Sequence, residues 1–171
     1  MSIQGTTRLL RTLAAGLLAL AMAAPATASW LAGERPADLG VKQGRLKPPS
    51  ATENSVSSQA ALYTGPGADY ARIAPLALRG DPATELRRLA QIVSALPGAR
   101  IVKQEDDYLY VEFSSRWLGF VDDVEFWAAP TEGVIHVRSA SRLGRRDFGV
   151  NRARIETVRS AFSTDPAPAA R

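Results

Sequence analysis

The feature that most constrains the fold is a set of three consecutive runs in which apolar and polar residues alternate. The runs cover residues 107–115, 119–127 and 133–140. Successive side chains of a β-strand point to opposite faces, so each run would place its apolar residues on one face and its polar residues on the other. The short connections between the runs favour an antiparallel meander with one apolar face. A shorter run at 100–104 precedes them, which predicts a sheet of four strands.

Two segments with helical periodicity flank these strands. Asp81 and Pro82 suit the cap and the first position of a helix, and apolar residues follow at helical spacing until Pro97. The same periodicity predicts a second helix from Asn151 to about Ser163. The apolar face of the sheet needs a cover, and two amphipathic helices need a surface to pack on. We therefore predict an α+β fold, in which a four-stranded antiparallel sheet carries two helices packed on one face.

Residues 1–28 have the composition of a secretory signal peptide. Two arginines precede an apolar run at 13–24, and Ala26-Thr27-Ala28 supplies the small residues that signal peptidase requires. An uncleaved membrane anchor is the alternative, but this run is shorter than the roughly 20 apolar residues of a membrane span. We therefore expect an exported protein of the periplasm or cell envelope, with no stable membrane anchor after cleavage.

The rest of the chain divides by its composition. Residues 29–60 are rich in Pro, Gly, Ser and Ala, and we expect them to form an extended arm. Residues 61–163 contain the predicted helices and strands and are expected to form one compact α+β domain. Residues 164–171 are expected to be a disordered tail.

The residue types that many enzymes and metal sites require are scarce in this chain. Its 171 residues include no Cys and one His, which excludes disulfides, thiolate chemistry and multi-His metal sites. We therefore expect no metal and no cofactor. The formal charge of +4 falls to +2 when Arg8 and Arg11 leave with the signal peptide. Since the chain also has no recognised nucleic-acid-binding motif, nucleic acid is not an expected partner.

The polar residues of the strands fall together on the second face of the predicted sheet. If the apolar residues of the last two runs share a face, the favoured register pairs Glu125 with His136 and Asp123 with Arg138. Residues 128–133 would then form the connection. Two interpretations remain open: this face is a shallow polar binding site, or it is a solvated surface with ion pairs between the strands.

The connection between the last strand and the second helix brings further polar residues together. We expect one neighbourhood there to hold Arg138, Arg142, Asp147, Asn151 and either Asp122 or Asp123. A buried network of Arg and Asp is one interpretation, and an anion-binding pocket at the start of the helix is the other. The candidate ligand-binding residues of both regions are Asp122, Asp123, Glu125, His136, Arg138, Arg142 and Asn151.

No catalytic residue is assigned from the sequence. The chain has no Gly-rich phosphate loop, nucleophile elbow or HExxH motif. In an extended strand Ser139 and Ser141 point away from His136, and the side chains of Asp122 and Asp123 diverge. The favoured function is a non-catalytic binding or interaction module whose partner is an envelope protein or an anionic small molecule. The alternative is a hydrolase-like enzyme that uses His136 with an acidic partner.

Three groups of residues resemble the motifs of one bacterial family. They lie within residues 39–60, 119–126 and 135–156, and they include Val56-Ser57-Ser58, Gly119-Phe120-Val121-Asp122-Asp123 and Ile135-His136-Val137-Arg138-Ser139. In content and order they are similar to the domain-of-unknown-function 1499 family over about residues 38–162. The resemblance implies a small exported or envelope-associated domain and brings no established activity.

One departure from the family pattern lies in the first motif. The resemblance implies two Cys at positions where this chain has Pro49 and Ser55. Any disulfide or thiol role that the family has therefore cannot operate here. The joint loss of both positions fits a structural cross-link better than a catalytic thiol.

Overall fold

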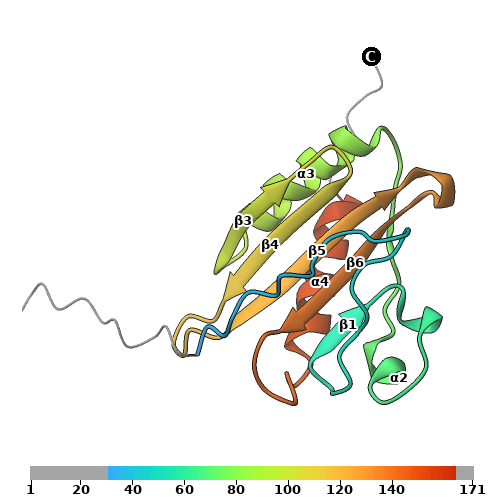
Figure 1. The fold of residues 1–171 in the computed structure, drawn as a ribbon. Coiled ribbons are helices and arrows are strands. Elements are labelled where there is room, and N and C mark those ends of the chain that lie inside the picture. Colours follow the sequence, from blue (N-terminus) through green and yellow to red (C-terminus); the bar gives the residue numbers. More distant parts are fainter. Residues whose placement is uncertain (1–30, 165–171) are drawn as a thin grey trace, which may run out of the picture. The chain divides into compact units, whose positions relative to one another are not determined.

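A computed structural model describes residues 31–164, and its central feature is an antiparallel sheet of six strands (Figure 1). The strand order is β1-β6-β5-β4-β3, and β2 also pairs with β6. β1 and β2 pair with different parts of the edge of β6 that β5 leaves open. The predicted signal peptide, residues 1–28, and residues 165–171 of the predicted tail lie outside the described residues.

The described residues contain more strands than the sequence predicts. The strands are β1 (Ser55–Ser57), β2 (Leu76–Ala77), β3 (Ala99–Gln104), β4 (Tyr108–Ser114), β5 (Val121–Ala129) and β6 (Val134–Ser141). The helices are α2 (Ala68–Ala71), α3 (Pro82–Ser94) and α4 (Val150–Thr164), with 3-10 turns at Ala60–Leu62 and Pro130–Glu132. The α+β class and the antiparallel sheet are confirmed, but the prediction of four strands was wrong. β1 and β2 are three and two residues long, too short for alternation to reveal them, and their pairing with β6 defines them.

Helices α3 and α4 cover the apolar face of the sheet (Figure 1). Asp81 caps α3 by accepting a hydrogen bond from the Thr84 N–H at 2.9 Å, and Pro82 takes the first helical position, as predicted. One buried cluster joins Leu86, Leu89 and Val93 of α3, Ile155, Val158 and Phe162 of α4, and Leu109, Val111, Val124, Phe126, Ile135 and Val137 of the strands. Within residues 31–164, no helix has the length and apolar character needed to cross a membrane.

β5 and β6 pair in a register that differs from the predicted one. Glu125 lies opposite Arg138 rather than His136, and Asp123 lies opposite Ala140 rather than Arg138. β5 continues to Ala129, two residues beyond its predicted end, and a 3-10 turn at Pro130–Glu132 closes the hairpin, so the connection is shorter than the predicted 128–133. The predicted register was therefore wrong by two residues. Because a shift of two keeps every side chain on its face, the division into an apolar and a polar face is correct.

Residues 31–50, called the arm below, cross the face of the sheet opposite the helices (Figure 1). Backbone hydrogen bonds of 2.8 and 3.1 Å join Lys42 and Arg45, and Gln43 and Gly44 between them both have positive φ. This is the geometry of a tight hairpin turn. The arm means that the alternating pattern of the strands does not mark one buried face and one solvated face, because both faces are covered.

Candidate functional site

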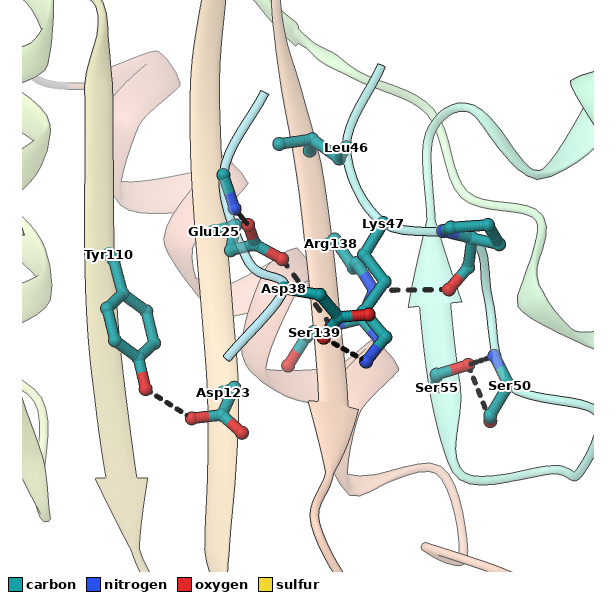
Figure 2. A network of polar contacts seen from close by, with 12 residues as sticks. Asp38, Leu46, Lys47, Ser50, Ser55, Tyr110, Asp123, Glu125, Arg138 and Ser139 are labelled. Carbon is teal, nitrogen blue, oxygen red and sulfur yellow. Dashed lines mark hydrogen bonds and ion pairs between the residues drawn. The ribbon is translucent and has the colours of Figure 1, made fainter. Parts of the chain in front are cut away.

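Most of the candidate residues lie on the face of the sheet that the arm covers, called the polar face below. Six charged or titratable side chains on this face are each less than a tenth exposed: Glu112, Asp123, Glu125, His136, Arg138 and Arg142. The polar face is therefore not a solvated surface, which was one of the two interpretations of the sequence. A buried charge is costly unless it gains partners inside the protein. Figure 2 shows part of the network that supplies these partners.

Arg142 is the centre of the first cluster on the polar face. Its guanidinium donates hydrogen bonds to Asp123 at 2.7–3.1 Å, to Glu112 at 2.5 Å and to the Tyr110 hydroxyl at 3.1 Å. The Tyr110 hydroxyl in turn donates to Asp123 at 2.5 Å (Figure 2). The hydrogen bond to Asp123 is the main reason why the pKa of Arg142 lies above its ordinary value. Burial, followed by the contact with Asp123, raises the pKa of Tyr110.

Glu112 receives three arginines from three parts of the chain. Arg35 of the arm approaches it to 2.6 Å, Arg142 approaches it to 2.5 Å, and Arg100 of β3 also forms an ion pair with it. Burial raises the pKa of Glu112, but the hydrogen bonds from the arginines outweigh burial and hold the pKa at about 2. The carboxylate therefore stays ionised at neutral pH and is fully engaged in structure.

Glu125 and Arg138 form the second cluster, and the arm completes it. Glu125 accepts hydrogen bonds from the Gly40 N–H at 2.7 Å and from the Tyr108 hydroxyl at 2.8 Å. Arg138 donates to Glu125 at 3.5 Å and to the Pro48 carbonyl at 3.4 Å, both long contacts (Figure 2). Burial lowers the pKa of Arg138, and burial raises that of Tyr108. Two backbone groups of the arm thus satisfy an ion pair that lies between the sheet and the arm.

His136 lies at the edge of the polar face and has partners that the sequence did not identify. Its ring stacks on Trp127 with 5.4 Å between centroids. Nδ1 lies 3.1 Å from the Ser58 Oγ, and Nε2 lies 3.2 Å from the Glu132 carboxylate. The Ser58 Oγ also accepts a hydrogen bond from the Val137 N–H at 2.9 Å. In the neutral imidazole, Nε2 therefore carries the proton toward the carboxylate, and Nδ1 accepts from the Ser58 hydroxyl.

Ser58 and Glu132 are the residues that sequence reasoning missed. The predicted register paired His136 with Glu125, which instead lies opposite Arg138. Glu132 lies in the hairpin turn four residues before His136, and Ser58 follows β1, whose pairing with β6 was not predicted. The signal that could have found Ser58 is its position in the first family-like motif.

Asp122 and Asn151 lie in a separate network on the apolar side of the sheet. Asp122 pairs with Arg154 of α4 at 2.6 Å. Asn151 is fully buried, accepts hydrogen bonds from Ser139 at 2.5 Å and Arg154 at 2.7 Å, and donates to the Asn54 carbonyl at 3.1 Å. The seven candidates therefore divide between the polar face and the apolar side of the sheet. The single neighbourhood expected at this connection is split in two: Arg142 lies with Asp123 on the polar face, whereas Asn151 lies with Asp147 on the other side. The cause is the alternation of the strand, which sends residues 122 and 123 to opposite faces.

The start of α4 is occupied by a carboxylate of the chain itself. Asp147 accepts hydrogen bonds from the Asn151 N–H at 2.8 Å, the Gly149 N–H at 3.1 Å and the Tyr70 hydroxyl at 2.7 Å. Burial raises the pKa of Asp147, but these hydrogen bonds outweigh it, so the pKa lies below its ordinary value. Asp147 thus takes the place that a bound anion would occupy at this helix end.

Two cavities of similar size adjoin the arm and β1. The first has a volume of about 300 Å³ and is lined by Ser57, Ser58, Ala61, Arg72, Ile73 and Ala74. The second has a volume of about 290 Å³ and is lined by Leu39, Gly40, Val41, Lys103, Glu105, Asp107 and Tyr108. None of the seven candidate residues lines either of these two cavities, whereas Ser58, the hydrogen-bond partner of His136, lines the first.

Comparison with known proteins gives one match. A family model described as "Protein of unknown function (DUF1499)" matches residues 45–162, a range that holds all six strands and nearly all of α4. No curated protein and no solved structure matches the sequence. The match covers well over half of the chain and agrees with the resemblance of its three motifs. The chain therefore belongs to the DUF1499 family of proteins of unknown function.

Proposed function

We propose that this protein is an exported, non-catalytic binding or interaction module of the periplasm or cell envelope. The export signal in residues 1–28 supports the location. The proposed partner is an envelope protein or an anionic small molecule. The absence of catalysis is supported by the internal hydrogen bonds and ion pairs of the charged groups on the polar face.

The observation that carries the proposal is that these groups are committed to one another. Asp123 and Glu112 are held by Arg142, and Glu125 is held by the Gly40 N–H and Tyr108. A general acid or base must reach the proton that it transfers, and a nucleophile must reach the substrate. Carboxylates buried beneath the arm with internal partners meet neither requirement, whereas they are suited to holding a rigid surface in shape.

Turnover measurements test the absence of catalysis. The purified protein is incubated with a model ester, a phosphate ester and a glycoside, and we expect no product above the buffer rate. Steady turnover that disappears in His136→Ala would contradict the proposal.

Export is tested separately by fractionating cells and sequencing the N-terminus, which we expect to begin at Ser29. Recovery of uncut chain from the cytoplasm alone would contradict that part.

A specific arrangement favours a second candidate function, a hydrolase. The Ser58 hydroxyl, the His136 imidazole and the Glu132 carboxylate form a chain with contacts of 3.1 and 3.2 Å. Ser58 also lines the first cavity, which has a volume of about 300 Å³. A nucleophile, a base and a group that orients the base are the parts that acyl transfer requires.

In this candidate the substrate is a small carboxylic ester that enters the first cavity. The Ser58 Oγ would attack the carbonyl carbon while its proton passes to Nδ1 of His136. The imidazolium would return that proton to the departing alcohol, and water would then hydrolyse the acyl group from Ser58. Glu132 would stabilise the imidazolium through Nε2, although its side chain is 55% exposed and this weakens the effect.

Three variants decide between the two functions. If the hydrolase operates, ester turnover is lost in Ser58→Ala and in His136→Ala and is reduced in Glu132→Gln, while the exposed Ser94→Ala retains full activity. If the protein is a non-catalytic module, all four chains release product at the buffer rate. Thermal unfolding of each variant shows whether it is folded when it is assayed.

A further inference from the structure

One end of the sheet exposes an unusual amount of apolar surface. This end, called the aromatic end below, consists of the β4–β5 turn at residues 115–120 and the segment from the end of β6 into α4 at residues 142–150. The Arg142 N–H donates to the Val121 carbonyl at 3.1 Å, which joins the two segments. Among residues 31–164, eight large apolar residues are exposed, and five lie at this end: Trp117, Leu118, Leu143, Phe148 and Val150.

The two aromatic side chains are the most exposed of the five. Trp117 is 85% exposed and Phe148 is 92% exposed. Phe148 also has a φ of +53°, a backbone conformation that a bulky residue rarely adopts. The backbone on its C-terminal side is fixed because Asp147, which is buried, accepts hydrogen bonds from the N–H groups of Gly149 and Asn151. A large aromatic ring is thus exposed to water on a loop whose backbone is held by hydrogen bonds, which indicates a binding role for the ring.

The charge of the aromatic end is positive. Arg116, Arg145 and Arg146 are exposed in the two segments. Arg116 lies over the Trp117 ring at 5.2 Å, and Arg146 forms an ion pair with Glu53 at 3.1 Å. The opposite end of the sheet differs in sign, since its turns expose Glu105, Asp106, Asp107 and Glu132. The molecule therefore has one end that attracts anions and one end that repels them.

The arm also begins at the aromatic end. A Cβ placed on Gly33 would lie 2.8 Å from the Arg142 side chain and 3.1 Å from that of Leu143, so the start of the arm packs directly against this end. The apolar run at residues 13–24 ends only a few residues before the start of the arm in the sequence. Only a short length of chain therefore separates the aromatic end from the run that meets the membrane during export.

We infer that the aromatic end docks on the surface of a bilayer that contains anionic phospholipids. Trp117 and Phe148 would enter the interfacial layer, where aromatic rings are favoured, and the arginines would face the phosphate groups. The contact that we propose is peripheral and reversible, through side chains of the aromatic end. This inference rests on the proposed function only for placing the protein at the envelope, and it names the partner surface.

The lack of Cys allows a direct test on the full chain. A single Cys replaces Leu118 at the aromatic end, beside Trp117, and is labelled with an environment-sensitive dye; Trp117 and Phe148 remain in place. Val41→Cys provides the matched comparator, because Val41 is exposed and lines the second cavity together with Glu105 and Asp107 of the opposite end. Both are mixed with phosphatidylcholine vesicles that contain no anionic lipid or about one-third phosphatidylglycerol.

On the anionic vesicles we expect the label at 118 to shift its emission to the blue and to become protected from aqueous iodide, while the label at 41 stays accessible. The second-site variants described next distinguish docking of this end from insertion of the N-terminal run alone. Equal accessibility at 118 and 41 in vesicle-bound protein overturns the inference. Equal protection at 118 on vesicles without anionic lipid overturns the assignment of the anionic surface.

Second-site variants test which residues produce the contact. In the chain labelled at 118, we expect Arg116→Ala and Arg145→Ala each to lower vesicle partitioning about fivefold at low salt. Phe148→Asn should also reduce protection of the label, and it should leave the loop intact because Asn accepts a positive φ. Unchanged partitioning in all three folded variants overturns the inference. These results are independent of the turnover and export measurements, so either proposal can fail without the other.

Discussion

The two faces of the sheet are both buried, but they are covered in different ways. On the apolar face, helices α3 and α4 pack regular structure on side chains such as Phe126, which has no exposed surface. On the polar face, an arm without long helices or strands covers charged residues by offering them hydrogen bonds and ion pairs. Arg35 of the arm pairs with Glu112, 77 positions away, and the Gly40 N–H pairs with Glu125, 85 positions away.

The two covers stabilise the sheet through different interactions. The apolar face depends on filled volume, and neighbouring side chains can partly adjust when one of them changes. The polar face depends on matching partners, because removing one partner leaves the other charge buried and unpaired. Removing one partner on the polar face is therefore expected to loosen both the arm and the charged network. On the apolar face, the loss of stability is expected to follow the volume of side chain removed.

The largest expected effect is on the apolar face. Phe126→Ala removes a fully buried ring from the centre of the cluster and is expected to lower the free energy of unfolding by about 3–5 kcal/mol. Urea-induced unfolding measures the change. Phe148→Ala is the matched control, since its ring is 92% exposed and its removal should cost little. A loss below about 1 kcal/mol in Phe126→Ala would show that the helices do not carry the stability of the sheet.

A slightly smaller loss is expected at the centre of the polar face. Arg142→Ala leaves Asp123 buried and removes one of the arginines from Glu112, so we expect a loss of about 3 kcal/mol. Limited proteolysis should in addition cut the arm faster in this variant, because the arm packs on the network that Arg142 holds. The exposed Arg145→Ala is the control. If Arg142→Ala costs no more than this control, the ion pairs of the polar face are dispensable.

Much of the fold was predictable from local patterns in the sequence. The alternation of the strands assigned Leu109 and Glu125 to their faces, and the Asp81 cap and Pro82 placed the start of α3. The register of β5 on β6 was missed because the 3-10 turn between them sets it. The other failure concerned partners distant in the sequence, in the pairing of β1 and β2 with β6. Those contacts are set by tertiary packing, for which a single sequence carries little signal.

The candidate site was predictable in its residue types but not in its surroundings. Asp123, Glu125 and Arg138 lie on one face as expected, yet nothing in the sequence indicates that the arm buries them. An arm without periodicity has no detectable preferred face, so its path across the sheet follows from the buried charges that it satisfies. Ser58, a partner of His136, was missed because it lies near the end of residues 29–60, a segment without periodicity whose contacts with the sheet could not be predicted.

An intermediate effect that depends on pH is expected at Glu112. Its pKa is about 2 in the folded protein and 4.5 in an unperturbed chain, so acidification protonates the unfolded state first. The stabilisation by this group is therefore fully present above pH 4.5 and is lost as the pH falls toward about 2. We expect Glu112→Gln to cost about 1–2 kcal/mol at neutral pH and progressively less in acid. A difference between the two unfolding free energies that stays constant from neutral pH to pH 2 would contradict the assignment.

The smallest effect is expected at the rim of the polar face. Its size shows how much the arm contributes to stability compared with the centre of the network. Arg35 is 47% exposed, and Glu112 keeps Arg142 and Arg100 when Arg35 is removed. Arg35→Ala should therefore cost less than about 1 kcal/mol in urea-induced unfolding, as solvent-exposed ion pairs usually do. Lys47→Ala, which removes a pair within the arm, is the matched comparator. If Arg35→Ala is instead as damaging as Arg142→Ala, the arm holds the network together, and the polar face forms only when the arm is docked.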